Sequence, residues 1–196
     1  MTVIRDAIEA DMAAVTDIYN SYLSTTTAAW SEREQTIDER IEWFRSRRSA
    51  GYPVLVAVDP KPGEPGEPGK PVEHDEPGEQ AEPGEHDGPG VVVGFTGCGP
   101  FRGAGMWPGY VHTAELTIFV AEPRLGTGVG DLLMGALVDR ATTSDLHVLV
   151  AGIDGDNIGS IRFHERWGFT EVARMPEVGR KWDRWLDLVL MQRTVG

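Results

Sequence analysis

The segment RLGTGVG, residues Arg124 to Gly130, places three glycines between an apolar run, LTIFV, and a stretch with helical spacing, DLLMGALVDRA. Glycine at this density is unfavourable inside any regular element. The pattern therefore predicts a strand, a tight turn and a helix, in that order. On the loop alone two interpretations remain open. The free N–H groups of the helix end bind an anion such as a pyrophosphate, or the glycines only satisfy the backbone angles of the turn.

Two well-known phosphate-binding loops do not match this segment. A P-loop requires a Lys-Ser/Thr pair after its last glycine, where this chain has Asp131 and Leu132. The dinucleotide fingerprint G-x-G-x-x-G accepts Gly126 and Gly128, but its sixth position is again Asp131.

The periodicity of apolar residues around the loop predicts a mixed α/β sheet with helices on both faces, in a single domain spanning residues 1–196. Predicted helices cover Asp11–Leu23, Thr36–Gly51 (with Thr36 and Glu39 at capping-box spacing), Val129–Ala141 and 157–168. Predicted strands cover Pro53–Asp59 and Gly90–Gly97 as a hairpin, then Ala114–Val120, Leu146–Ile153, 169–175 and 184–193. In the third helix, we expect Leu132, Leu133, Ala136 and Leu137 to be buried.

The 59–90 segment has a different composition from the rest of the chain. It holds ten acidic residues and two lysines, so it carries −8 of the net charge of −13. It has almost no apolar side chains, and we therefore expect a disordered acidic insert in the hairpin turn. His74 and His86 lie there at irregular spacing, and we expect no metal site.

Charge and composition also limit the class of protein. The net charge of −13 argues against nucleic-acid binding. No apolar run approaches the length of a membrane span, and the N-terminal segment does not read as a signal peptide. The single cysteine, Cys98, cannot form an internal disulfide, which is compatible with a reducing cytoplasm.

Two motifs together resemble the GNAT N-acetyltransferase superfamily. The segment AELTIFVAEPRLGTGVGDLLMGALVDRA is similar to its coenzyme A motif, with Leu125 where Gln or Arg is usual. The segment NIGSIRFHERWGF matches the second signature, with His164 where many members have a tyrosine. The stretches IYNSYL, YVHTAELTIFV and EVGRKWDRWLDLVLMQ resemble the phosphinothricin acetyltransferase-like branch. The resemblance covers nearly the whole chain except 59–90.

The resemblance implies a GNAT fold, acetyl-CoA as cosubstrate, a small free amine as acceptor and a homodimer. It implies that Glu115 is the general base and that His164 relays a proton or orients the substrate. The implied coenzyme-binding residues are Ile118, Phe119 and Val120 through their backbones, the loop residues Leu125, Gly126, Thr127, Gly128, Val129 and Gly130, and Asn157 and Ser160. The implied substrate-binding residues are Trp30, Arg102, Trp107 and Tyr110.

The substrate is predicted to be an amino acid or an analogue such as phosphinothricin, methionine sulfone or methionine sulfoximine. Trp107 stands where the branch has an arginine for the substrate's acid group, and Arg102 lies five residues earlier. Alternatives are acetylation of polyamines or protein N-termini, and a non-catalytic acyl-CoA sensor. Cys98 has no neighbouring histidine in the sequence, so we expect direct transfer without a covalent enzyme intermediate.

Overall fold

The computed structural model describes residues 1–60, 90–102 and 106–196. The strands are β1 (Val3–Asp6), β2 (Val54–Asp59), β3 (Val91–Pro100), β4 (Thr113–Val120), β5 (Val148–Asp154), β6 (Thr170–Lys181) and β7 (Arg184–Thr194). The α-helices are α1 (Met12–Leu23), α2 (Ile37–Ser49), α3 (Val129–Thr142) and α4 (Ile158–Arg166), and the short 3-10 helices are η1 (Glu9–Asp11), η2 (Pro108–Tyr110) and η3 (Glu122–Arg124).

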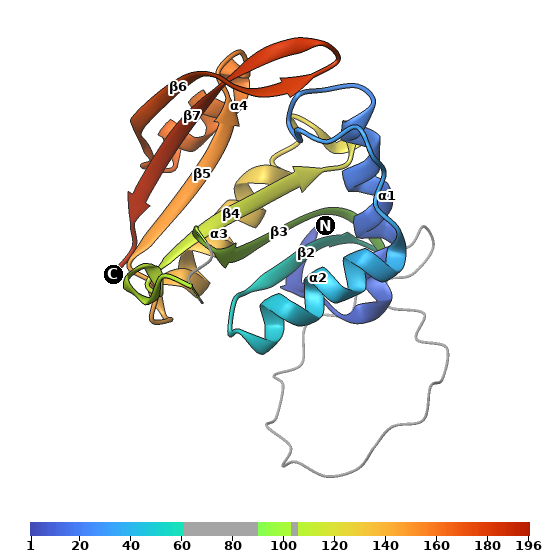
Figure 1. The fold of residues 1–196 in the computed structure, drawn as a ribbon. Coiled ribbons are helices and arrows are strands. Elements are labelled where there is room, and N and C mark those ends of the chain that lie inside the picture. Colours follow the sequence, from blue (N-terminus) through green and yellow to red (C-terminus); the bar gives the residue numbers. More distant parts are fainter. Residues whose placement is uncertain (61–89, 103–105) are drawn as a thin grey trace.

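Within the described residues these strands form one twisted sheet in the order β1-β2-β3-β4-β5-β7-β6 (Figure 1). The pair β4–β5 is parallel and every other pair is antiparallel. Helices α1 and α2 bury Met12, Val15 and Phe44 against one face, while Met134 and Leu137 of α3 pack on the other. The predicted mixed sheet with helices on both faces is confirmed.

Strands β2 and β3 form the predicted antiparallel hairpin, with Val54 opposite Gly97 and Asp59 opposite Val91. The prediction of a disordered acidic insert falls on residues 61–89, which lie outside the described part of the chain. Thr36 and Glu39 form the predicted capping box: Oγ1 of Thr36 accepts from the Glu39 N–H, and the Glu39 carboxylate accepts from the Thr36 N–H.

Two predictions of detail were wrong. Leu132 is 48% exposed. The face of α3 that packs on the sheet carries Leu133, Met134, Leu137 and Val138 instead. Strand β6 also does not end at residue 175 but continues to Lys181. The backbone passes Pro176 with a register shift between Met175 and Gly179, as is tolerated in an edge strand.

Strands β4 and β5 separate in the middle of the sheet. They pair only over Thr113–Glu115 and Val148–Val150, and beyond these positions no pairing joins them within the described residues. Figure 1 shows the two ribbons diverging past this point, which splits the sheet into a V. The half of β4 that follows Glu115 therefore faces an opening instead of a neighbouring strand.

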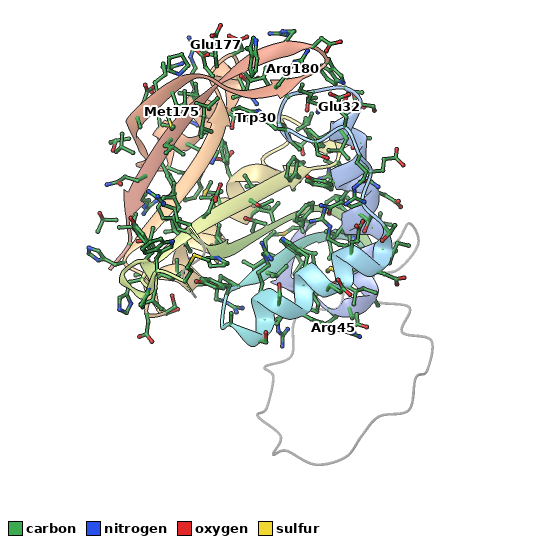
Figure 2. The ribbon with its side chains drawn as sticks, in the orientation of Figure 1. Trp30, Glu32, Arg45, Met175, Glu177 and Arg180 are labelled. Atoms are coloured by element: carbon green, nitrogen blue, oxygen red, sulfur yellow. The ribbon has the colours of Figure 1, made fainter. Side chains whose placement is uncertain are left out.

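The β6–β7 hairpin is fixed to the loop between α1 and α2. The Lys181 ammonium, at the end of β6, donates to the carbonyl oxygens of Thr26 and Ala29 at 2.7 Å each. The indole of Trp30 packs so closely on Gly179 that a β-carbon there would lie 2.2 Å from the ring (Figure 2). The loop is thus held over the wide end of the V.

Candidate active site

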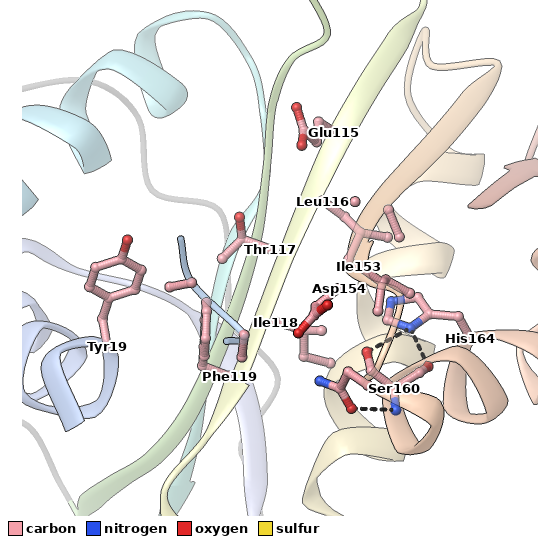
Figure 3. Close-up of a pocket in the computed structure, with 15 residues that line it drawn as sticks. Tyr19, Glu115, Leu116, Thr117, Ile118, Phe119, Ile153, Asp154, Ser160 and His164 are labelled. Carbon is pink, nitrogen blue, oxygen red and sulfur yellow. Dashed lines mark hydrogen bonds between the residues drawn. The ribbon is translucent and has the colours of Figure 1, made fainter. Parts of the chain in front are cut away.

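The V-shaped opening holds two adjoining cavities that share Ala28, Ile118, Phe119, Asn157, Ser160 and His164. The larger, about 670 Å³, runs along β4 to the glycine loop at the start of α3. The smaller, about 250 Å³, is lined by Glu115 of β4 and by Tyr19 of α1 (Figure 3). Together they connect a loop suited to anions with a carboxylate, and a long ligand could lie along this path.

The glycine loop turns as the sequence pattern predicts. Gly126 and Gly128 have φ of +71° and +89°, a backbone region that favours glycine, and Gly128 is the N-cap of α3. The first N–H groups of α3 have no partner within the helix, so the loop presents donors to the larger cavity. Leu125 and Gly130 also line this cavity.

Three loop positions behave differently from the rest. The Thr127 hydroxyl bonds back to the carbonyl oxygen of Arg124, and the Val129 side chain is buried against Leu133, so neither lines the larger cavity. Arg124 lines it but forms an ion pair with Asp59. Arg124 is therefore already in an ion pair. It is not simply a substitute for the side chain of the Gln or Arg that usually stands at the position of Leu125.

Helix α4 contributes one wall of the site. Oδ1 of Asn157 accepts from the Ser160 N–H at 3.1 Å and caps the helix. One turn on, Nδ1 of the buried His164 lies 2.8 Å from the Ser160 carbonyl oxygen (Figure 3). Nε2 of His164 is buried without a hydrogen-bond partner among the described residues, although the ring lines both cavities.

Glu115 lies where β4 and β5 begin to separate. Its Oε1 is 3.4 Å from the point where a β-carbon on Gly152 of β5 would stand, so the carboxylate reaches across the narrow end of the V. The residue is exposed to solvent, but the surrounding protein removes enough water from the carboxylate to raise its pKa above 4.5. The positive charge of Arg47 opposes this rise.

Beyond Glu115, β4 offers backbone groups to the opening. Leu116 to Val120 remain paired with β3 on one side, through register partners such as Thr96 opposite Ile118. The side that would meet β5 has no strand partner in the described residues. Ile118, Phe119 and Val120 line the larger cavity. Unpaired amides there are placed to donate to a carbonyl oxygen or to an amide of a ligand.

The sequence analysis missed Arg47 of α2. Its guanidinium lies on Gly99 of β3, with Nη2 3.0 Å from the point where a β-carbon would stand. Gly99 is the register partner of Glu115, so Arg47 stands beside the carboxylate on the same face of the sheet. The glycines at 97 and 99, alternating along one face of β3, were the signal of a close approach.

The predicted substrate-binding residues lie outside the two cavities that most of the other predicted site residues line. Phe101 packs edge-on against Tyr110, whose ring also meets the Arg102 guanidinium at 5.6 Å, while Trp107 is 57% exposed. None of these loop residues lines either cavity in the described part of the chain. Trp30 lies against Gly179, and its neighbours Ala28 and Ala29 line the smaller cavity in its place. The substrate roles of Trp30, Arg102, Trp107 and Tyr110 stay predictions.

Cys98 lies in the core behind the site. The side chain is buried, and burial raises the pKa of its thiol to about 12. A thiol with this pKa supplies almost no thiolate near neutral pH.

Among the described residues no cluster of His, Cys, Asp or Glu side chains is arranged to hold a metal ion, and no helix is long and apolar enough to cross a membrane.

Comparison with known proteins identifies this arrangement. The chain is 36% identical to L-methionine sulfoximine/L-methionine sulfone acetyltransferase of Salmonella typhimurium, over 96% of this chain and 92% of that protein. It is also 36% identical to an L-amino acid N-acyltransferase of Escherichia coli, over 96% and 91% of the two chains. The solved structure of a phosphinothricin acetyltransferase from Sinorhizobium meliloti in complex with acetyl-CoA superposes with a TM-score of 0.81 at 27% identity, covering 100% of this chain and 89% of that one. The model of the acetyltransferase (GNAT) family matches residues 15–169, and the chain belongs to that family.

Proposed function

We propose that this protein transfers the acetyl group of acetyl-CoA to the free amine of a small amino acid or amino-acid analogue. The observation that carries the proposal is the position of Glu115, which lines the smaller cavity that adjoins the coenzyme-sized groove along β4. A carboxylate of raised pKa in this smaller cavity is suited to take a proton from an incoming amine. The relatives act on molecules of this class, which supports the choice of substrate.

In this mechanism the acetyl donor lies in the larger cavity, with its pyrophosphate on the N–H groups of Gly126 to Gly130. Glu115 accepts a proton from the substrate ammonium, and the amine then attacks the thioester carbonyl carbon. Unpaired N–H groups of β4 between Ile118 and Val120 stabilise the oxyanion that forms. The carbon–sulfur bond breaks as the oxyanion collapses, and the leaving thiolate takes up a proton.

His164 serves the leaving group in this scheme. Its Nδ1 donates to the Ser160 carbonyl oxygen, which leaves Nε2 as an acceptor, and the residue lines both cavities. Nε2 takes the remaining extra proton from the nitrogen of the tetrahedral intermediate and passes it to the leaving thiolate, a relay that suits an imidazole near neutral pH. Asn157 contributes by capping α4, and Ser160 by holding the ring, while Cys98 takes no part because its thiol is buried and protonated.

The chain as a whole fits one catalytic domain, a proposal supported by the family match over residues 15–169 and the single sheet. We propose the cytoplasm as its location, because a chain with a single cysteine has no internal disulfide to maintain and suits a reducing compartment. The resemblance to the phosphinothricin acetyltransferase-like branch supports a homodimer. Light scattering of the purified protein at several concentrations measures the oligomeric state directly.

A substrate panel tests the function. The protein is given acetyl-CoA and, in turn, methionine sulfone, methionine sulfoximine, phosphinothricin, ordinary amino acids, a polyamine and a short peptide with a free N-terminus. Release of free thiol is followed over time. We expect turnover with amino acids or their analogues and much weaker turnover with the polyamine and the peptide. Acetyl-CoA binding by calorimetry without thiol release from any amine would support a non-catalytic sensor instead.

A further inference from the structure

The side of α2 that faces the sheet carries a row of large side chains. Arg40 stacks on Tyr19 and Trp43, with its guanidinium carbon 4.3 Å and 5.0 Å from their ring centroids. Trp43 in turn lies over Gly97, and Arg47 over Gly99. The register partners of Gly97 and Gly99 on β4 are Thr117 and Glu115. The polar end of this row is the pair formed by Arg47 and Glu115.

The two charges at that end are close but not joined. Among the described residues no carboxylate lies within ion-pair distance of the Arg47 guanidinium, whose recorded hydrogen bond goes to the Ser46 hydroxyl at 3.2 Å. Arg47 is only half-buried, and its charge lies close enough to Glu115 to affect the pKa of that carboxyl. A cation and an anion that stand side by side without contact leave room for a small molecule carrying the complementary charges.

An α-amino acid has this charge pattern, since its ammonium and carboxylate are separated by a single carbon. With the ammonium at Glu115, the carboxylate falls on the side of Arg47. A guanidinium can bind a carboxylate through two parallel hydrogen bonds, which fixes orientation as well as position. The side chain of the amino acid is then directed into the cavity bounded by Tyr19, Ala28 and Phe119.

We propose that Arg47 binds the carboxylate of the amino-acid substrate and selects α-amino acids over amines without an acid group. This inference rests on the proposed amino-acid acetylation. It also gives a reason for the glycine at 99, because any side chain there would meet the guanidinium at 3.0 Å. Arg102, the sequence-based candidate for this role, lies against the Tyr110 ring, whereas the cation that acts on the Glu115 carboxyl is Arg47.

The test compares Arg47→Gln with wild type on two substrates, methionine sulfone and its primary amide. The amide keeps the amine and the side chain but lacks the negative charge. We expect Arg47→Gln to raise KM for methionine sulfone by about 10- to 100-fold and KM for the amide by no more than about threefold, the range for one charge-assisted contact. Arg47→Lys should recover part of the loss. Assays run well above the titration of Glu115, so that a changed pKa of this base does not affect the comparison.

Arg45→Gln is the matched control on the same helix. Arg45 pairs with Glu9 on the exposed side of α2, and its loss should leave both KM values unchanged. If Arg47→Gln does not fold, Gly99→Ala displaces the guanidinium by a smaller amount and should raise KM for methionine sulfone alone. Equal changes for acid and amide, or none for either, would overturn the role of Arg47 while leaving the function intact. Wild-type protein that acetylates no amino acid would instead overturn the proposed function.

Discussion

Nδ1 of His164 lies 2.8 Å from the carbonyl oxygen of Ser160, one turn earlier on α4. A carbonyl oxygen only accepts hydrogen bonds, so this contact places the ring proton on Nδ1 and makes Nε2 an acceptor. Burial lowers the pKa of His164 below 6.5, and the bond to Ser160 opposes this in part. The ring therefore stands neutral near pH 7, ready to accept a proton.

The first prediction concerns this ring. His164→Phe removes the acceptor but keeps a planar ring, and we expect kcat to fall about 100-fold while KM for acetyl-CoA changes little, as for the loss of an acid–base group. Initial rates over a range of both substrates measure the two constants. A rise in the acetyl-CoA KM with unchanged kcat would show that His164 orients the coenzyme and does not relay a proton.

His164 also links stability to pH. Because the folded state binds this proton less tightly than the unfolded chain, the unfolded state gains protons as pH falls through 6.5. The free energy of unfolding should thus decrease as pH falls below 6.5, and His164→Phe should remove part of this slope. Denaturant titrations at a series of pH values measure it. Parallel slopes in the two proteins would contradict a lowered pKa.

Glu115→Gln tests the base. The amide cannot take a proton, so kcat should fall by about 10²- to 10⁴-fold with acetyl-CoA binding unchanged. In wild type, burial raises the pKa of Glu115 above 4.5, and activity should be lost as pH falls through that raised value. Glu42→Gln, on the exposed side of α2, is the control. Wild-type turnover by Glu115→Gln across the pH range would show that another group is the base.

The glycine loop and the α4 segment were predictable because each is a local sequence pattern. The first lies within a single strand–turn–helix unit, and the second within a single helix. Gly126, Gly128 and Asn157 hold their places through backbone angles and a cap that neighbouring residues determine. Leu132 was misplaced because two apolar residues stand next to each other in α3, and only packing against the sheet decides which is buried.

Contacts between distant segments were not predictable in the same way. Arg47 meets Gly99 only because α2 crosses β3 at that height, and Trp30 meets Gly179 across residues far apart in the chain. Arg102 and Tyr110 were assigned by analogy with a pattern in which Trp107 already departs from the usual residue. Sequence spacing does not fix how such a loop packs on its neighbours.

A matched pair of glycines tests the loop. Gly128 and Gly51 both have positive φ and no atom within 4 Å of an added β-carbon, but Gly51 lies after α2, outside both cavities. Gly128→Ala and Gly51→Ala should each cost roughly 1–2 kcal/mol of stability through backbone strain. Only Gly128→Ala should turn the loop amides and raise KM for acetyl-CoA, by about tenfold for one lost contact to a charged group. Equal KM values in both variants would leave the glycine with a role in the turn alone.

Cys98→Ala tests direct transfer. The thiol is buried and its pKa is raised to about 12, so it is a poor nucleophile. We expect turnover within about twofold of wild type, and a loss of about 1 kcal/mol in stability from the small cavity left behind. An alkylating reagent should also fail to modify the native protein. Complete loss of activity in a folded Cys98→Ala protein would indicate an acetyl-cysteine intermediate.

The last prediction concerns the loop that Lys181 and Gly179 hold over the cleft. Gly179→Ala would place a methyl group 2.2 Å from the Trp30 ring, so the indole must move. We expect a loss of roughly 1–3 kcal/mol in stability, typical of overpacking. Because Ala28 and Ala29, just before Trp30, line the smaller cavity, KM for the amine should rise as well. Gly109→Ala, whose methyl meets no atom within 4 Å, is the control. Wild-type stability and indole fluorescence in Gly179→Ala would contradict this packing, whereas lower stability with an unchanged amine KM would separate Trp30 from substrate binding.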